Sequence, residues 1–303
     1  MIGNTVRMKK LTIVVIVLLS GSYSLISCKN KNKDTKTPDG PNIIFKFKFD
    51  STLARLDNFG QPSSIPSNHS AQSPLFNKLS AHYVELAADD YVPLGSGSVL
   101  YRAKETSMGG TNAIDFQYST IVGNGGEFLG IPIKNVSPGS YKWLRVSLAY
   151  QNCQIKYKAT ISGTDYYLNG TIASFVGFNT YIKSYQIQNL SVGVNANKLQ
   201  GYWGFESSGT TTVGQAPPGA TTVPNPLASS SPIPTGSCVV TGSFPSNLVV
   251  TGNETSDITI TVTLSTNKSF EWKDANGNGW YEPLAGDTAV DMGLRGLYPS
   301  VIY

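Results

Sequence analysis

Oxygen-bearing side chains recur at every second position of a short segment near the C-terminus. Asp274, Asn276 and Asn278 are followed by Gly279, which permits a sharp turn. Alternate side chains of a tight loop point inward, and Ca²⁺ prefers about six to eight oxygen ligands. The spacing therefore predicts a calcium site. The expected ligands are the side chains of Asp274, Asn276, Asn278, Glu282 and Asp287 and the backbone carbonyl of Trp280.

The first half of this segment matches an EF-hand loop, and the second half departs from it. Ala285 stands where an EF-hand has its bidentate glutamate, and Pro283 argues against a following helix. The spacing instead resembles the Asp-x-Asn-x-Asp-Gly calcium loops of extracellular bacterial β modules, which need no flanking helices. The competing interpretation is a surface turn, which Asn and Gly favour without any ion.

The chain has two histidines, His69 and His82. Residues 79–85 alternate like a strand, and this places His82 and Glu85 on opposite faces. Two histidines and a carboxylate could hold zinc or copper, although Glu85 would need a bulge to join them. Copper at His69 and His82 is therefore the alternative to calcium. A structural role for each histidine is the simpler interpretation.

Sequence patterns of several catalytic sites are missing. The chain has no Gly-x-Ser-x-Gly elbow, no His-Glu-x-x-His pair and no glycine-rich phosphate loop. A Ser-His-Asp triad or a glycosidase carboxylate pair would be visible only in space. We therefore expect a binding protein and not an enzyme. Trp143, Trp203 and Trp280 could stack a sugar, which makes a carbohydrate-binding or carbohydrate-active protein the second alternative.

The N-terminus has the pattern of a secretory signal with a lipidation site. A basic pair, Lys9-Lys10, precedes an apolar run at residues 11–19 that is too short to span a bilayer comfortably. The segment ends at Cys28 and resembles bacterial lipoprotein signals, in which this cysteine becomes the lipidated first residue. We expect residues 1–27 to be the signal and residues 28–41 to be a polar tether. An uncleaved anchor helix is the alternative.

The charge of the remaining body argues against a nucleic-acid partner. The chain has 23 basic and 19 acidic residues; the signal removes three basic residues, and the tether through Asp39 removes four basic and two acidic ones, which leaves 16 against 17. A nearly neutral body lacks the footprint of a nucleic-acid binder. The expected partners are the membrane, through the lipid, and an envelope protein or glycan. The expected location is the bacterial cell envelope.

Period-two alternation of apolar and polar residues predicts an all-β fold. It marks residues 45–49, 142–150, 155–161 and 258–264, each with one face suited to burial. No amphipathic helix is evident, and the many Tyr, Phe and Thr residues agree with strand packing. We therefore predict an antiparallel β-sandwich in one large domain, residues 42–303. In the second segment, the stripe expected on one face is Leu144, Val146, Leu148 and Tyr150.

Residues 207–236 are dense in Pro, Thr, Ser and Gly. Their prolines exclude a regular central strand. The segment is either a linker between two domains or an ordered excursion from one domain, and its scattered apolar residues favour the excursion. Cys153 precedes this segment and Cys238 follows it, and the two could pair in an oxidising compartment. Since cysteine is among the most buried residue types, two buried thiols are the simpler interpretation.

Five short stretches carry a family resemblance: Phe47–Asp50, Ser80–Leu86, Ala113–Phe116, Pro138–Arg145 and Gly201–Gly204. Together they resemble a family of uncharacterised bacterial lipoproteins. Their order is also similar to domains of the methanobactin-associated copper-binding protein, which implies one continuous β domain and copper as the alternative cofactor. The chain has no histidine after His82, so that family's later metal-binding histidines have no counterpart here.

Overall fold

The computed structural model describes residues 40–57, 61–216, 237–292, 294 and 296–303. The predicted signal, Cys28 and most of the tether lie outside the described residues, as does most of the Pro-rich segment. The described residues all belong to one structural unit, Pro38–Tyr303. No helix in this part of the chain is long and apolar enough to cross a membrane. Its helical segments are three short 3₁₀ turns: η1 (Phe116–Tyr118), η2 (Ile133–Asn135) and η3 (Pro283–Ala285).

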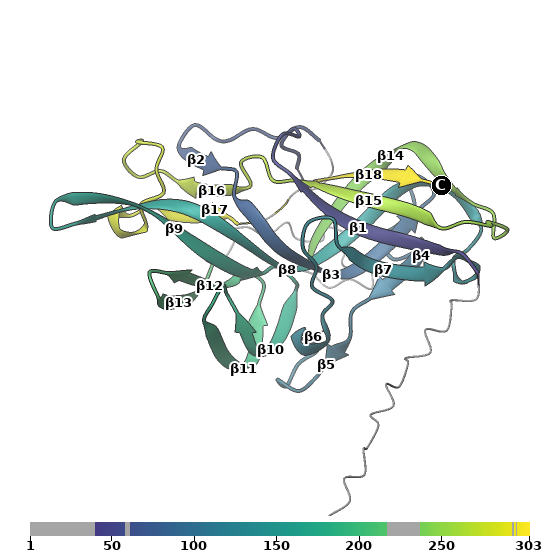
Figure 1. Ribbon diagram of the computed structural model, residues 1–303, viewed down its shortest axis with the longest axis horizontal. Coiled ribbons are helices and arrows are strands. Elements are labelled where there is room, and N and C mark those ends of the chain that lie inside the picture. The colour runs from purple at the N-terminus through teal and green to yellow at the C-terminus, as the bar shows by residue number, and fades with distance from the viewer. Residues whose placement is uncertain (1–39, 58–60, 217–236, 293, 295) are drawn as a thin grey trace, which may run out of the picture. The chain divides into compact units, whose positions relative to one another are not determined.

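The fold is all-β, as the alternating segments predicted, and its strands form four sheets (Figure 1). We name each sheet after one of its strands. The β1 sheet has the order β18 (Leu297–Ile302), β15 (Ile258–Ser265), β1 (Asn42–Asp50) and β7 (Glu127–Pro132). The β8 sheet has the order β13 (Thr210–Gln215), β12 (Tyr202–Ser207), β9 (Thr164–Phe175), β8 (Gly139–Ile161), β3 (Leu75–Ala87) and β4 (Ser98–Arg102), and β14 (Cys238–Val250) also pairs with β8.

Two smaller sheets complete the unit. The β10 sheet has the order β11 (Ser191–Leu199), β10 (Asn179–Gln186), β6 (Ala113–Asp115) and β5 (Glu105–Thr106). The β16 sheet has the order β17 (Thr288–Asp291), β16 (Phe270–Lys273) and β2 (His69–Gln72). Most neighbouring strands are antiparallel, as expected, but β1 pairs with β15 and β6 pairs with β10 in parallel.

The long strand β8 organises its sheet. Residues 143–154 pair with β3, residues 139–148 pair with β14, and residues 150–161 pair with β9. Since β3 occupies one edge of β8, β14 and β9 follow one another along the other edge. The C-terminal half of β8 therefore extends beyond the region that β14 covers. With its neighbours β9 and β12, this extension carries the pocket described below.

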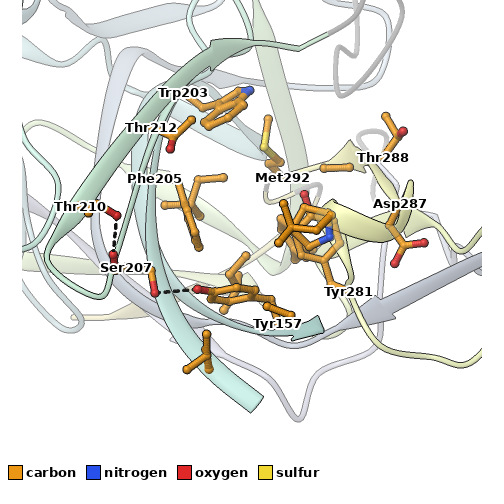
Figure 2. Close-up of a pocket in the computed structure, with 18 of the residues that line it drawn as sticks. Tyr157, Trp203, Phe205, Ser207, Thr210, Thr212, Tyr281, Asp287, Thr288 and Met292 are labelled. Atoms are coloured by element: carbon orange, nitrogen blue, oxygen red, sulfur yellow. Dashed lines mark hydrogen bonds between the residues drawn. The ribbon is translucent and has the colours of Figure 1, made fainter. Parts of the chain in front are cut away.

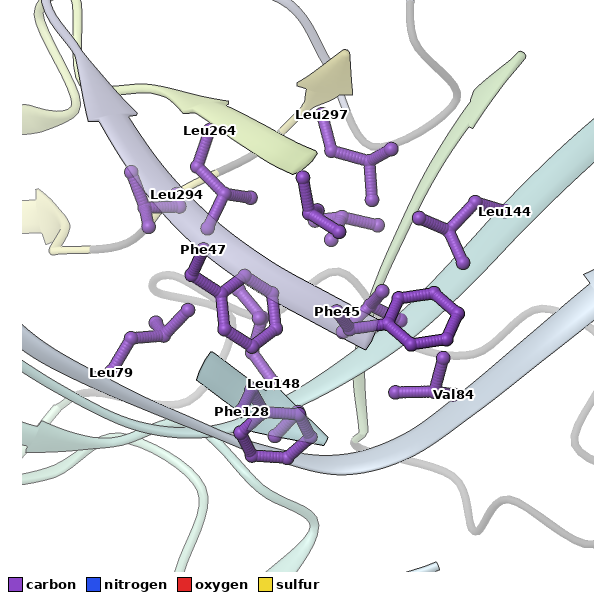
Figure 3. Packing of buried hydrophobic residues seen from close by; sticks show 14 of the residues in the cluster. Phe45, Phe47, Leu79, Val84, Phe128, Leu144, Leu148, Leu264, Leu294 and Leu297 are labelled. Carbon is purple, nitrogen blue, oxygen red and sulfur yellow. The ribbon is translucent and has the colours of Figure 1, made fainter. Parts of the chain in front are cut away.

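The main core lies between the β1 sheet and the β8 sheet (Figure 3). On β1, Phe45 and Phe47 are buried while Lys48 is exposed, as the alternation predicted. Phe47 packs on Phe128 of β7, with 5.1 Å between ring centroids. The facing strands contribute leucines such as Leu148 to the same cluster. One face of each sheet is thus buried. The removal of apolar surface from water is the dominant favourable term in folding.

The predicted stripe on β8 was right for Leu144 and Leu148 and wrong for Tyr150. Tyr150 belongs to a second buried cluster, which joins β9, β10 and β12 on the opposite face of the β8 sheet. The cause is a bulge at Ala149: Ala81 of β3 pairs with Leu148, and the preceding residue of β3 pairs with Tyr150. One extra residue in a strand shifts every later side chain to the other face.

Cys153 is a free thiol buried in the main core, so no disulfide joins it to Cys238. Burial raises the pKa of Cys153 to about 12, which keeps the thiol protonated and unreactive. Of the Pro-rich segment, residues 207–216 are described; they contain the last residue of β12, a turn and β13, which pairs with β12 as a hairpin. The first residues of that segment are therefore sheet, and not linker.

Candidate ion loop and apolar pocket

The predicted calcium segment is the connection between β16 and β17, which we call the Asp274 loop (residues 274–287). Two backbone hydrogen bonds fasten it to other segments of the chain. The Asp274 amide donates to the Asn68 carbonyl at 3.3 Å, and the Lys158 amide of β8 donates to the Tyr281 carbonyl at 2.8 Å. The loop is therefore held against β8 on one side and beside β2 on the other.

The carboxylate of Asp274 organises the first turn of the loop. It accepts backbone hydrogen bonds from Gly277 at 2.8 Å, Asn278 at 3.2 Å and Gly279 at 2.8 Å. The Ser70 hydroxyl donates to it at 2.7 Å. Burial alone would raise the pKa of Asp274, but these hydrogen bonds hold it below its ordinary value. Gly279 has a φ of 79°, a conformation that favours glycine, as the expected sharp turn requires.

Glu282 is the point on which the two predicted asparagine ligands converge. The Asn276 amide donates to Glu282 Oε2 at 2.9 Å, and the Asn278 amide donates to the same oxygen. Lys158 Nζ lies 3.0 Å from Glu282 Oε1. The hydrogen bonds from the two asparagines hold the pKa of Glu282 below its ordinary value, and Lys158 adds to this. The carboxylate is therefore ionised and surrounded by donors.

Asp287 closes the loop at its end. One carboxylate oxygen accepts from the Ala275 amide at 2.9 Å and the other from the Glu282 amide at 2.7 Å. The amide of Trp280 donates to Asn278 Oδ1 at 2.8 Å, and the Trp280 ring packs on Tyr167 of β9. The structure thus gathers all the predicted side-chain ligands into one hydrogen-bonded loop.

The two histidines do not share a site in the described structure. His69 Nδ1 contacts Glu271 of β16, whereas His82 Nε2 lies 3.0 Å from Glu105 Oε1 of β5. Glu85 instead accepts hydrogen bonds from the backbone amides of the loop before β4. Within the described residues, no three His, Cys, Asp or Glu side chains gather at a metal-binding spacing. This holds for the three carboxylates of the Asp274 loop as well, at Asp274, Glu282 and Asp287.

The pairing of Glu105 with His82 predicts a specific acid sensitivity. The hydrogen bond from His82, followed by those from Asn112 and Arg102, lowers the pKa of Glu105 from 4.5 to about 2, against the opposing effect of burial. A depressed folded-state pKa stabilises the protein above the unfolded-state pKa and loses this stabilisation as the pH falls toward the folded-state pKa. Wild-type protein should therefore lose roughly 1–3 kcal/mol between about pH 5 and about pH 2 through Glu105 alone.

Urea unfolding across this pH range, compared with a Glu105→Gln variant, measures that contribution. The variant should start less stable near neutral pH and show a shallower decline on acidification. Glu127→Gln, which changes an exposed glutamate of β7, is the control and should follow the wild type. Parallel pH curves for wild type and Glu105→Gln would contradict the prediction.

An apolar pocket of about 580 Å³ lies beside the Asp274 loop (Figure 2). Four parts of the chain line it: the C-terminal half of β8, the neighbouring strand β9, the hairpin of β12 and β13, and the segment from Phe270 of β16 to Met292. The predicted stripe of residues 155–161 does share one face, but part of that face borders this pocket instead of filling a core. Labelled side chains in Figure 2 include Tyr157 of β8, Phe205 of β12 and Tyr281 of the loop.

Of the three tryptophans proposed to stack a ligand, Trp203 lines this pocket. Trp143 donates its indole N–H to Asp90 at the surface, and Trp280 packs on Tyr167. Sequence reasoning missed the pocket because its walls come from segments that are far apart in the chain.

No family model, curated protein or solved structure matches this chain. The resemblance to bacterial lipoproteins stays a prediction from short stretches of sequence, and function has to be inferred from the geometry of the loop and the pocket.

Proposed function

We propose that this protein is a lipid-anchored component of a bacterial cell envelope with a non-catalytic binding role, in which the Asp274 loop holds a structural Ca²⁺. The N-terminal pattern that ends at Cys28 supports the anchor. Each buried methylene of an attached lipid contributes about 0.8 kcal/mol, and two or more chains hold a protein durably at a membrane. The binding role is supported by the apolar pocket.

The observation that carries calcium is the convergence of Asn276, Asn278 and Lys158 on the carboxylate of Glu282. Three donor groups surround one anionic side chain. A divalent cation can take the place of these donors beside the carboxylate. The oxygen and nitrogen ends of an asparagine amide exchange by rotation of the side chain, so the same residues can offer oxygens to an ion. Asp274 supplies a further ionised carboxylate at the start of the loop.

Calcium should raise the melting temperature of the purified protein. At free calcium about 100-fold above the dissociation constant, binding to the folded state alone contributes about 2.7 kcal/mol. For a unit of this size, that corresponds to a shift of roughly 5–10 °C. Melting curves with calcium, with chelator and with calcium restored, combined with metal analysis, measure the effect.

Three variants sharpen this experiment. Asp274→Asn should abolish most of the calcium-dependent shift, whereas Asp90→Asn changes an exposed aspartate at the Lys142 pair and should leave the shift intact. Lys158→Met should enlarge the shift, because Glu282 loses its intramolecular cation. A protein that carries no calcium and melts identically in chelator would contradict the proposal. Stoichiometric copper in the metal analysis, lost in His69→Ala or His82→Ala, would favour the copper alternative instead.

A further inference from the structure

We propose that the pocket beside the Asp274 loop binds a neutral, apolar small molecule of hydrocarbon character, either an acyl chain or a fused-ring compound. This inference rests on the binding role proposed above but not on calcium. The walls and the rim of the pocket indicate the chemistry of the ligand. So do the hydrogen bonds that several polar groups of the lining already make within the protein.

The size and walls of the pocket suit such a ligand. Its volume of about 580 Å³ falls within the range of roughly 300–1,000 Å³ that is typical of small-molecule sites. Trp203 and Phe205 of β12 form one side, and Tyr281 of the Asp274 loop and Met292 form another (Figure 2). Aromatic rings and a flexible thioether make close contact with hydrocarbon of varied shape.

Three hydroxyl groups of the lining are occupied by protein partners. Tyr157 Oη lies 2.9 Å from Ser207 Oγ, and Ser207 Oγ in turn donates to the Asn169 carbonyl at 3.0 Å. The Thr210 hydroxyl donates to the Ser207 carbonyl at 3.0 Å, and Figure 2 shows the first and last of these bonds. At the edge of the pocket, the Gln215 amide donates to the Gln200 carbonyl. A polar ligand would have to break bonds that already satisfy these groups.

The lining also offers little to a charged ligand. Asp287 is the one Asp, Glu, Lys or Arg among the described lining residues. Both of its oxygens accept backbone hydrogen bonds from the Asp274 loop. Burial, and then the charge of Asp287, raise the pKa of Tyr281 to about 12, so the Tyr281 side chain adds no charge to this wall. An anionic group would lose its hydration without gaining an ion pair, which is strongly unfavourable.

Part of the rim of the pocket is apolar as well, beside exposed polar residues such as Thr210 and Thr288. Ile161, at the end of β8, is 55% exposed, and Leu284 of η3 is 76% exposed, and both border the pocket. Tyr167 and Trp280 form an aromatic pair on the adjoining segments of β9 and the loop. Exposed apolar side chains gathered at the mouth of a cavity are typical of ligand-binding grooves, and here they extend the apolar surface of the interior to the outside.

Titration of the purified protein with Nile red, a neutral apolar dye, tests the inference in detergent-free buffer. The dye should bind saturably, with a gain in fluorescence. Leu284→Asp should weaken binding about tenfold, because it places a charge at the mouth of an apolar site. Leu199→Asp is the matched control: Leu199 is 67% exposed on β11 and is not among the lining residues. It should bind the dye like the wild type. Circular dichroism should show that both variants are folded.

Competition identifies the source of the hydrocarbon. Displacement of the dye by hexadecanol indicates an acyl chain, and displacement by phenanthrene indicates a fused-ring compound. Hexadecanoate, which differs from hexadecanol by its charged head, should displace the dye less well than the alcohol. The inference is overturned by non-saturable dye binding, by equal affinities of the Leu284→Asp and Leu199→Asp variants, or by equal displacement with hexadecanoate and hexadecanol. If the melting temperature still depended on calcium in that case, the structural-ion proposal would survive alone.

Discussion

Replacement of Phe47 by alanine should destabilise the protein by about 3–5 kcal/mol, the usual cost of truncating a fully buried aromatic side chain. Phe47 is 1% exposed and lies in the middle of β1, which pairs with β15 on one edge and β7 on the other. Its ring packs on Phe128 and lies among the leucines between the two sheets (Figure 3). The truncation would leave a void that rigid sheets on both sides cannot close.

Urea unfolding monitored by tryptophan fluorescence measures this loss. The matched control is Lys48→Ala on the same strand, whose side chain is about half exposed and pairs with Asp50 at the surface. Exposed substitutions of this kind usually stay within about 0.5 kcal/mol of the wild type. The slope of the free energy of unfolding against urea concentration should stay the same, since the unfolded state is unchanged. A cost below about 1 kcal/mol for Phe47→Ala would mean that the sheets do not pack through this stripe.

The sheet faces of β1 and β15 could be predicted from sequence because period-two alternation is a local signal. Phe45 and Phe47 need no knowledge of their partner strands to be placed on one buried face. Tyr150 could not be placed in this way. Its direction depends on the bulge at Ala149, and the bulge exists because of how β8 pairs with β3. A register defect of this kind depends on contacts between strands that are about 70 residues apart, as the pairing of Ser80 with Tyr150 shows.

The Asp274 loop could be found from sequence because its oxygen-bearing residues lie within one short segment. Its tertiary partners could not. Ser70 of β2 donates to Asp274, and Lys158 of β8 pairs with Glu282, and neither residue is close to the loop in sequence. Lys158 matters most, because it places a competing positive charge on a carboxylate that the sequence assigned to calcium. The pocket was invisible for the same reason: Tyr157, Phe205 and Tyr281 meet only after the sheets have formed.

The second large effect is expected at a buried cluster of charges that the sequence did not indicate. Arg55 contacts Glu271 of β16 and lies 3.9 Å from Asp291 of β17. The same guanidinium donates to the Lys268 carbonyl, and His69 of β2 contacts the other oxygen of Glu271. Arg55, Glu271 and Asp291 are all buried, so the cluster joins an irregular N-terminal segment to the three strands of the β16 sheet.

Arg55→Leu should cost about 3–5 kcal/mol, because removing one partner of a buried ion pair leaves a charge in a medium that solvates it poorly. Lys142→Leu is the matched control: it breaks the ion pair with Asp90, in which both side chains are about half exposed, and such surface pairs contribute about 0–1 kcal/mol. Urea unfolding of the two variants gives the difference directly. The double variant Arg55→Leu/Glu271→Leu should recover part of the loss, since it removes the stranded carboxylate together with its partner. If Arg55→Leu cost no more than Lys142→Leu, the cluster would be accessible to water, and the ion pair would add little to the attachment of the Arg55 segment to β16.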